Sequence, residues 1–441
     1  TNSVKAIARS AGFENIRVAT YPGVFQTHAE STIVKNIEDV LVDQIVEQLV
    51  HGQPTRAQSK ACPADRDIVF RGSFEEVNRH FQDQTWSDGL PIVPPTLDKV
   101  EAFLKFTDRA PGEVLGVMHP SEAEASVWKV AVNGVMAGCR PENMPILIAI
   151  VEAMADPQYG VKHGGSTTGW EAMIVLNGPV ADQLGFNHGI GVQRPGNQAN
   201  TSVGRFYRLF CRNVLRFLPG TTDMATYGSM FRAVLVEDDQ ACADIGWQPL
   251  HETRGFKLRD SVVTLTSVRA MSDPFSTVGD TAERHLEYVL DGVRRMINPY
   301  EASEGYEETN VLLLTPVVAQ ILARAGYSKQ GVNDYILKNA RLSARDFERG
   351  MTMGNAHPPG TTLRALVEQG HMPPAWAESD DPERLVPLML PQTQWLVIVT
   401  GDPTRSRCCV FRQSFKQGYA TSRKIELPAR WEALLEQAKQ A

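Results

Sequence analysis

Short apolar runs along the chain alternate with longer segments in which apolar residues recur at helical spacing. The apolar runs predict buried strands over residues 172–176, 231–236, 262–267, 310–315 and 395–400. Apolar positions three and four residues apart predict amphipathic helices over residues 32–50, 203–217 and 281–298. Strands that are apolar throughout and alternate with helices indicate an α/β fold, with mixed or parallel sheets and helices on both faces.

Breaks in this pattern predict the domain organisation. Residues 51–67 are polar, contain one glycine and two prolines, and show little periodicity, which is typical of a linker. A chain of 441 residues is long enough for two or three domains. We expect an N-terminal segment over residues 1–50, an α/β domain with the substrate site over residues 68–275, and a second α/β domain over residues 276–441.

The N-terminal segment is expected to be part of a larger layered unit. A short helix, a strand over residues 16–20 and the helix over residues 32–50 cannot bury a strand by themselves. We therefore expect residues 1–50 to pack in a sheet whose other strands belong to a separate polypeptide. If cleavage produces the end at Thr1, a structural role for that end is favoured over use of the Thr1 amine and hydroxyl in catalysis.

Composition excludes several classes of function. The net charge of −7 and the pI of about 5.9 give no electrostatic support for nucleic-acid binding. No apolar run approaches the roughly 18 residues that a membrane span needs, and no signal peptide is recognised. Six cysteines in a chain of this length indicate reduced thiols in a cytoplasmic protein, one or two of which are candidates for reactivity.

Three polar, glycine-rich loops carry most of the candidate chemistry, over residues 163–169, 186–200 and 219–228. Glycines let the backbone approach a ligand, and a helix N-terminus, such as the one expected after the second loop, attracts anions. We therefore expect a small, polar and anionic substrate. The candidate binding residues are Ser166, Thr167, Asn187, Arg194, Asn197, Asn200, Thr201 and Arg205.

The candidate catalytic residues are Cys139, His163, His188 and Asp223. Cys139 precedes an expected helix N-terminus and is followed by Arg140, and both features lower a thiol pKa. A reactive thiolate and a buried structural cysteine are equally compatible with this position. The two histidines are candidates for acid–base work or metal binding, and Asp223 would orient a histidine or bind a cation.

Familiar cofactor signatures are absent from the sequence. It contains no Cys-x-x-Cys, His-Glu-x-x-His or Walker A motif, and Gly189-Ile-Gly191 lacks the third glycine of a dinucleotide loop. The sequence therefore gives no NAD or P-loop nucleotide signature. A divalent metal is the one cofactor that the histidines and Asp223 leave open.

Several motifs resemble those of one bacterial group, the UGSC-type (seleno)protein family and its associated large domain. The middle of the chain carries the stronger likeness, in Asp-Gly-Leu-Pro-Ile-Val-Pro-Pro-Thr at 88–96, Val-Asn-Gly-Val-Met-Ala-Gly-Cys-Arg-Pro-Glu at 132–142 and Pro-Gly-Asn-Gln-Ala-Asn-Thr-Ser-Val-Gly-Arg at 195–205. The N-terminal segment is similar to the C-terminal part of the UGSC-like domain, which implies a partial Rossmann-like unit. The resemblance also implies thiol or selenol chemistry on a small molecule.

The leading interpretation is an enzyme in a hetero-complex that acts through Cys139 with acid–base help from His163 or His188. A thiol-dependent oxidoreductase or lyase is favoured. The second is a hydro-lyase or hydrolase without a redox step, in which His163, His188 and Asp223 transfer protons or hold a metal. The third is a ligand-binding subunit without catalysis. We expect an oligomer in each case.

Overall fold

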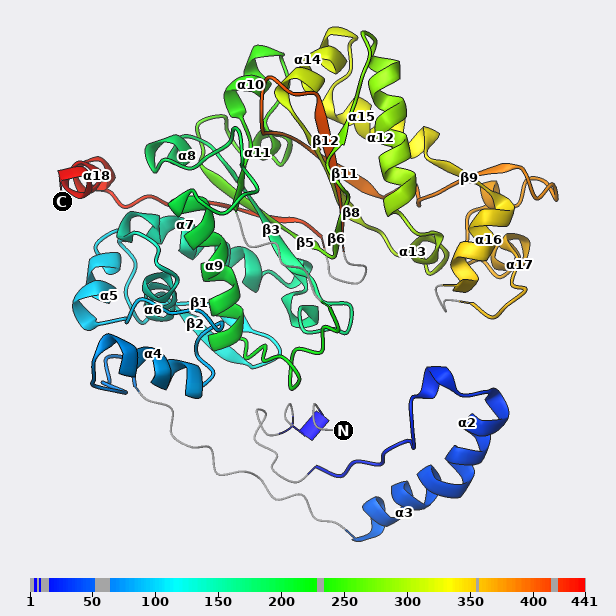
Figure 1. Ribbon diagram of the computed structural model, residues 1–441, viewed down its shortest axis with the longest axis horizontal. Coiled ribbons are helices and arrows are strands. Elements are labelled where there is room, and N and C mark those ends of the chain that lie inside the picture. Colours follow the sequence, from blue (N-terminus) through cyan, green and yellow to red (C-terminus); the bar gives the residue numbers. More distant parts are fainter. Residues whose placement is uncertain are drawn as a thin grey trace.

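Two β-sheets packed face to face form the centre of the molecule, and helices cover their outer surfaces (Figure 1). The computed structural model describes residues 4–5, 8, 16–51, 64–227, 234–353, 357–413 and 419–440. The mixed α/β class expected from the sequence is confirmed. Among the described residues, no helix is both long and apolar enough to cross a membrane.

The first sheet has the strand order β13-β5-β3-β4. Its central strand β3 pairs in parallel with β4 and antiparallel with β5, which in turn pairs antiparallel with β13. The strands span Glu171–Asn177 (β3), Val234–Val236 (β4), Val262–Val268 (β5) and Thr421–Lys424 (β13).

The second sheet repeats this arrangement. Strand β8 pairs in parallel with β11 and antiparallel with β12, and the edge beside β12 is filled by the short strands β6 and β7. These strands span Ala270–Met271 (β6), Phe275–Ser276 (β7), Thr309–Leu314 (β8), Gln394–Val399 (β11) and Arg407–Arg412 (β12). The two halves of the chain therefore share one strand order and one set of strand directions.

The halves exchange their edge strands. Strands β6 and β7 directly follow β5 of the first sheet but pair with β12 of the second, whereas β13 follows β12 and pairs with β5. The domain boundary expected after residue 275 therefore falls inside β7. Two sheets linked in this way are expected to fold as one unit.

Alternate side chains of each strand face two different cores. Met173 and Val175 of β3 pack with Val311 and Leu313 of β8 between the sheets. The opposite face of each sheet packs on helices, as for Leu176 in the first sheet. We expected helices on both faces of the sheets. Each sheet has them on one face only, because its other face is covered by the second sheet.

Helices α6, α7 and α9 cover the first sheet, and α12, α14 and α15 cover the second (Figure 1). A capping box at Ser73 begins α4. The helices of the body span Phe74–Asp83 (α4), Leu97–Leu104 (α5), Val127–Ala137 (α6), Met144–Ala155 (α7), Val180–Gln183 (α8), Gln198–Asn213 (α9), Asp239–Asp244 (α10), Leu250–Thr253 (α11), Ala282–Met296 (α12), Pro299–Ser303 (α13), Pro316–Arg324 (α14), Lys329–Asn339 (α15), Ala344–Met353 (α16), Leu363–Glu368 (α17) and Trp431–Gln440 (α18). Two antiparallel hairpins complete the body, formed by Val114–Met118 (β1) with Ala123–Ser126 (β2) and by Arg341–Ser343 (β9) with Leu385–Pro387 (β10).

Residues 16–51 of the N-terminal segment lie apart from this body (Figure 1). Its continuous helix consists of Glu30–Asn36 (α2), the π-helical turn Ile37–Leu41 (η2) and Val42–His51 (α3), and none of these residues is buried. Residues 16–20, which were expected to form a strand, have no regular secondary structure and pair with no strand among the described residues. The partial Rossmann-like unit therefore stays a prediction.

A buried carboxylate joins the two halves where β4 ends. The Glu237 side chain is fully buried and accepts hydrogen bonds from Asn177 and the Leu250 backbone in the first half. It also accepts from the Val399 backbone and forms a 2.5 Å ion pair with Lys329 in the second half. One carboxylate oxygen thus has its partners in the first half of the chain, and the other oxygen has its partners in the second half.

Replacing Lys329 by Met is expected to lower the free energy of unfolding by about 3–5 kcal/mol, because it leaves Glu237 buried and without its counter-charge. Urea denaturation would measure the change. The matched control is Arg295→Met in the exposed Arg295–Asp291 pair, which should change stability by less than about 1 kcal/mol. Equal effects of the two substitutions would contradict the role assigned to this ion pair.

Candidate functional site

The three predicted loops lie at two different ends of strand β3. Residues 163–169 immediately precede the strand, whereas residues 186–197 follow it. A seven-residue strand is about 20 Å long. The structure therefore does not bring His163 and His188 together, and the single site expected from the three loops is divided.

At the first end of β3, two of the loops are joined. The backbone N–H of Met224 donates to the Gly165 carbonyl at 2.9 Å, and that of Thr226 donates to the Thr167 carbonyl at 3.1 Å. The Ser166 hydroxyl lies 3.1 Å from the Thr168 hydroxyl. These contacts make residues 163–169 and 221–227 one surface feature that includes the predicted residues His163, Ser166 and Thr167.

Asp223 does not orient a histidine in this arrangement. Its carboxylate is buried and bonds to Arg208 of helix α9 at 3.0 Å, while the same guanidinium binds Glu171 at 3.1 Å. The nearby Tyr207 hydroxyl has a pKa well above its usual range because it is buried. Arg208 is shared by two buried carboxylates and thereby links the loop that carries Asp223 to strand β3 and helix α9. Asp223 was expected to orient a histidine or bind a cation, but its carboxylate pairs with Arg208 instead.

The amides of the second loop bind their own backbone. Asn200 is buried and links its side chain to the Asn187 and Val234 backbones. Asn197 caps α9 and donates to the Gly185 carbonyl, and the Thr201 hydroxyl accepts from the Gly196 N–H. A loop that turns this sharply must satisfy its own polar groups, so these expected ligand-binding residues are structural instead.

Arg205 was also expected to bind substrate, but its guanidinium is engaged within the fold. It forms two hydrogen bonds with the carboxylate of Asp88, at 2.9 and 3.1 Å, and a third with the Pro91 carbonyl. The bidentate pair fixes the proline-rich segment 86–95 on helix α9. In contrast, the Arg194 side chain is exposed and makes no hydrogen bond or ion pair with any described residue, although its backbone N–H donates to the Gly191 carbonyl.

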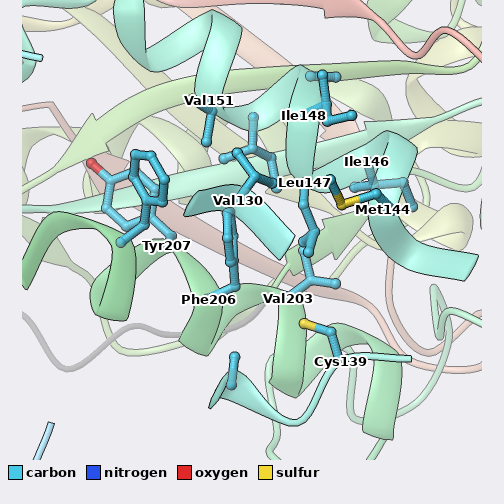
Figure 2. Packing of buried hydrophobic residues seen from close by; sticks show 14 of the residues in the cluster. Val130, Cys139, Met144, Ile146, Leu147, Ile148, Val151, Val203, Phe206 and Tyr207 are labelled. Atoms are coloured by element: carbon cyan, nitrogen blue, oxygen red, sulfur yellow. The ribbon is translucent and has the colours of Figure 1, made fainter. Parts of the chain in front are cut away.

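The Cys139 thiol is buried rather than activated. Figure 2 shows its side chain beside Val203 of helix α9, in the apolar cluster that covers the first sheet. Burial raises the pKa of Cys139 to about 12, and the nearby Ser202 hydroxyl and Arg205 offset this only in part. The lowered pKa inferred from the helix N-terminus and Arg140 is therefore wrong, because desolvation outweighs both favourable charges.

At the second end of β3, His188 lies at the junction of the two sheets. Its backbone carbonyl accepts hydrogen bonds from the Gly401 N–H at 2.8 Å and the Thr400 hydroxyl at 3.0 Å, just beyond strand β11. The imidazole Nδ1 is 3.3 Å from the carboxylate of Asp238, which follows β4. The side chain remains 39% exposed, so one side of the ring faces Asp238 and the other side is accessible to solvent.

No protein-family model, curated protein or solved structure matches this chain. The resemblance to the UGSC-type family therefore stays a prediction, and the site has to be interpreted from its own geometry.

The sequence did not identify the residues that hold His188. Asp238 is not among the predicted site residues, and Thr400 and Gly401 lie more than 200 positions along the chain from His188. The position of Asp238 directly after an apolar strand was a usable signal, because ligands gather at the carboxyl ends of parallel strands. No local pattern could have paired Thr400 with His188.

The geometry does not favour the predicted metal site. His188 lies at the opposite end of β3 from His163 and Asp223, so these three side chains cannot bind one ion. Among the described residues, no group of three or more His, Cys, Asp or Glu side chains is arranged to hold a metal.

A small hollow lies away from all predicted site residues. It has a volume of about 120 Å³ and is lined by Arg109, Glu152, Glu426 and neighbouring residues. Arg109 is already bound to Glu113 and Glu152 there. This volume is below the roughly 300 Å³ of a typical ligand pocket, so we do not assign the substrate to it.

Iodoacetamide is expected to leave Cys139 unmodified at neutral pH in the folded chain and to modify it readily in urea. A thiol with a pKa of about 12 is ionised in only about one molecule in 10⁵ at pH 7. Peptide mass spectrometry would measure the extent of labelling. Rapid labelling of folded chain that disappears in Cys139→Ser would show that the thiol is reactive after all.

Proposed function

We propose that this protein is an enzyme that transfers protons on a small, polar and anionic molecule, with His188 as the acid–base residue. The proposal rests on the placement of His188. Its backbone carbonyl accepts a hydrogen bond from Thr400, and its ring lies beside the carboxylate of Asp238. A histidine held by a carboxylate is a common arrangement for proton transfer near neutral pH.

The surroundings of His188 support this role. Nδ1 is buried and has no aligned hydrogen bond among the described residues, so the Asp238 carboxylate is the polar group that it faces. Nε2 is on the partly exposed side, 3.9 Å from the carboxylate of Asp182. Asp238 would fix the orientation of the ring and leave Nε2 to exchange a proton with substrate.

The anionic character of the substrate rests on Arg194. This residue follows His188 on the same loop and has an exposed guanidinium without a described partner. A guanidinium that is free in this way suits a carboxylate or phosphate group. The other charged candidate ligand, Arg205 of helix α9, is paired with Asp88.

A thiolate mechanism at Cys139 is less well supported, because burial holds the pKa of that thiol at about 12. The proposal therefore follows the interpretation without a redox step. It uses His188 alone among the predicted catalytic residues, together with Asp238, which the sequence did not single out.

His188→Gln is expected to lower turnover by about 10²–10⁴-fold, because the amide cannot exchange a proton at neutral pH. Asp238→Asn should also lower turnover, because the ring loses the carboxylate that orients it. Purified chain would be incubated with pools of small carboxylates and phosphates, and mass spectrometry would record which are consumed.

His119→Gln is the matched control, since His119 also pairs with a carboxylate, that of Glu122, but on the exposed surface. It should leave turnover unchanged. Unaltered turnover in His188→Gln would remove this residue from the mechanism. Binding of an anion by wild-type chain without any turnover would favour the ligand-binding subunit instead.

A further inference from the structure

The α3 helix of the N-terminal segment has an uncovered apolar stripe. Val42, Ile45, Val46, Leu49 and Val50 recur at intervals of three and four residues and are each between 42% and 71% exposed. At about 100° per residue they occupy one face of α3. We call these five residues the α3 stripe.

Residues 16–20 contact a different face of α3. The Gln44 side chain bonds to the Thr20 backbone N–H at 2.8 Å, and the Arg17 guanidinium donates to the Gln48 and Leu49 carbonyls. Residues 16–20 therefore run along the side marked by Gln44 and Gln48. They flank the α3 stripe without burying it.

A helix in this situation gains little stability from its own chain. Helices in proteins depend mainly on packing of their apolar face for stability. Contiguous exposed apolar residues on a protein surface mark interaction sites. The helix from Glu30 to His51 makes no contact that buries any of its residues.

The charge of the helix favours one kind of binding partner for the α3 stripe over another. The helix over residues 30–51 carries five acidic residues and one lysine, and Asp43 and Glu47 border the α3 stripe on the side away from Gln44. Two copies of the helix packed together would bring like charges close to each other. We infer that the α3 stripe is the docking surface for a separate polypeptide that presents an apolar helix face bordered by Lys or Arg. This inference does not depend on the proposed acid–base function.

The test uses the full chain and two labelled synthetic helices with the same apolar stripe, one with lysines beside it and one with glutamates. Fluorescence anisotropy should show binding of the basic helix only, weakening as salt is raised. Ile45→Asn with Leu49→Asn should weaken it at least about tenfold, because two apolar side chains no longer lose water on binding. Asp43→Asn with Glu47→Gln, which keeps the stripe, should also weaken it and reduce its salt dependence.

The matched control is His51→Asn, on the face of α3 opposite the stripe, which should bind like wild type. Equal binding of both synthetic helices, or full binding after the Ile45 and Leu49 substitutions, would overturn the inference. Sedimentation of the chain alone tests whether a second copy of the chain binds the α3 stripe instead. An oligomer that is lost only in the Ile45→Asn, Leu49→Asn variant would assign the stripe to a second copy and also overturn it.

Discussion

The buried carboxylate of Glu237 is the interaction on which the arrangement of the two halves depends. It accepts hydrogen bonds from Asn177 in one half and from the Val399 backbone in the other, and Lys329 supplies its counter-charge. Isolated charges are costly in an apolar interior, so this carboxylate is compatible with the fold only when both halves are docked. The exchanged edge strands make the same connection through the backbone, since each sheet is completed by the other half of the chain.

The candidate site follows from this junction. Where β4 and β11 end beside each other, Thr400 donates to both the Val236 and the His188 carbonyls. The loop that carries His188 is thereby fixed to both sheets, and the next residue after Glu237 supplies the carboxylate near its ring. The packing of the two sheets, rather than the loop itself, would make a proton-transfer site at this position rigid.

Burial, more than the types of residue present, separates the structural groups from the chemical ones. Cys139, Asn200 and Asp223 lie in the interior, and each is fully occupied there or is kept uncharged by desolvation. His188 and Arg194 reach the surface and keep part of their polar capacity available. The α3 stripe shows the reverse situation, since apolar side chains that would normally be interior are exposed to water.

The periodicity of apolar residues predicts the mixed α/β class, five of the central strands and three long helices, because periodicity, like the capping box at Ser73, is a local property. The sequence by itself also located His188 in a polar loop after a buried strand. Tertiary structure alone decided how the elements are shared between the sheets, because the edge exchange pairs β5 with β13 across more than 150 residues. It likewise decided the state of the Cys139 thiol, since the charges beside it are visible in the sequence but the apolar side chains that desolvate it are not. Local sequence patterns indicate which chemistry a residue is capable of. Packing alone determines the dielectric environment and the partners of that residue in the folded chain.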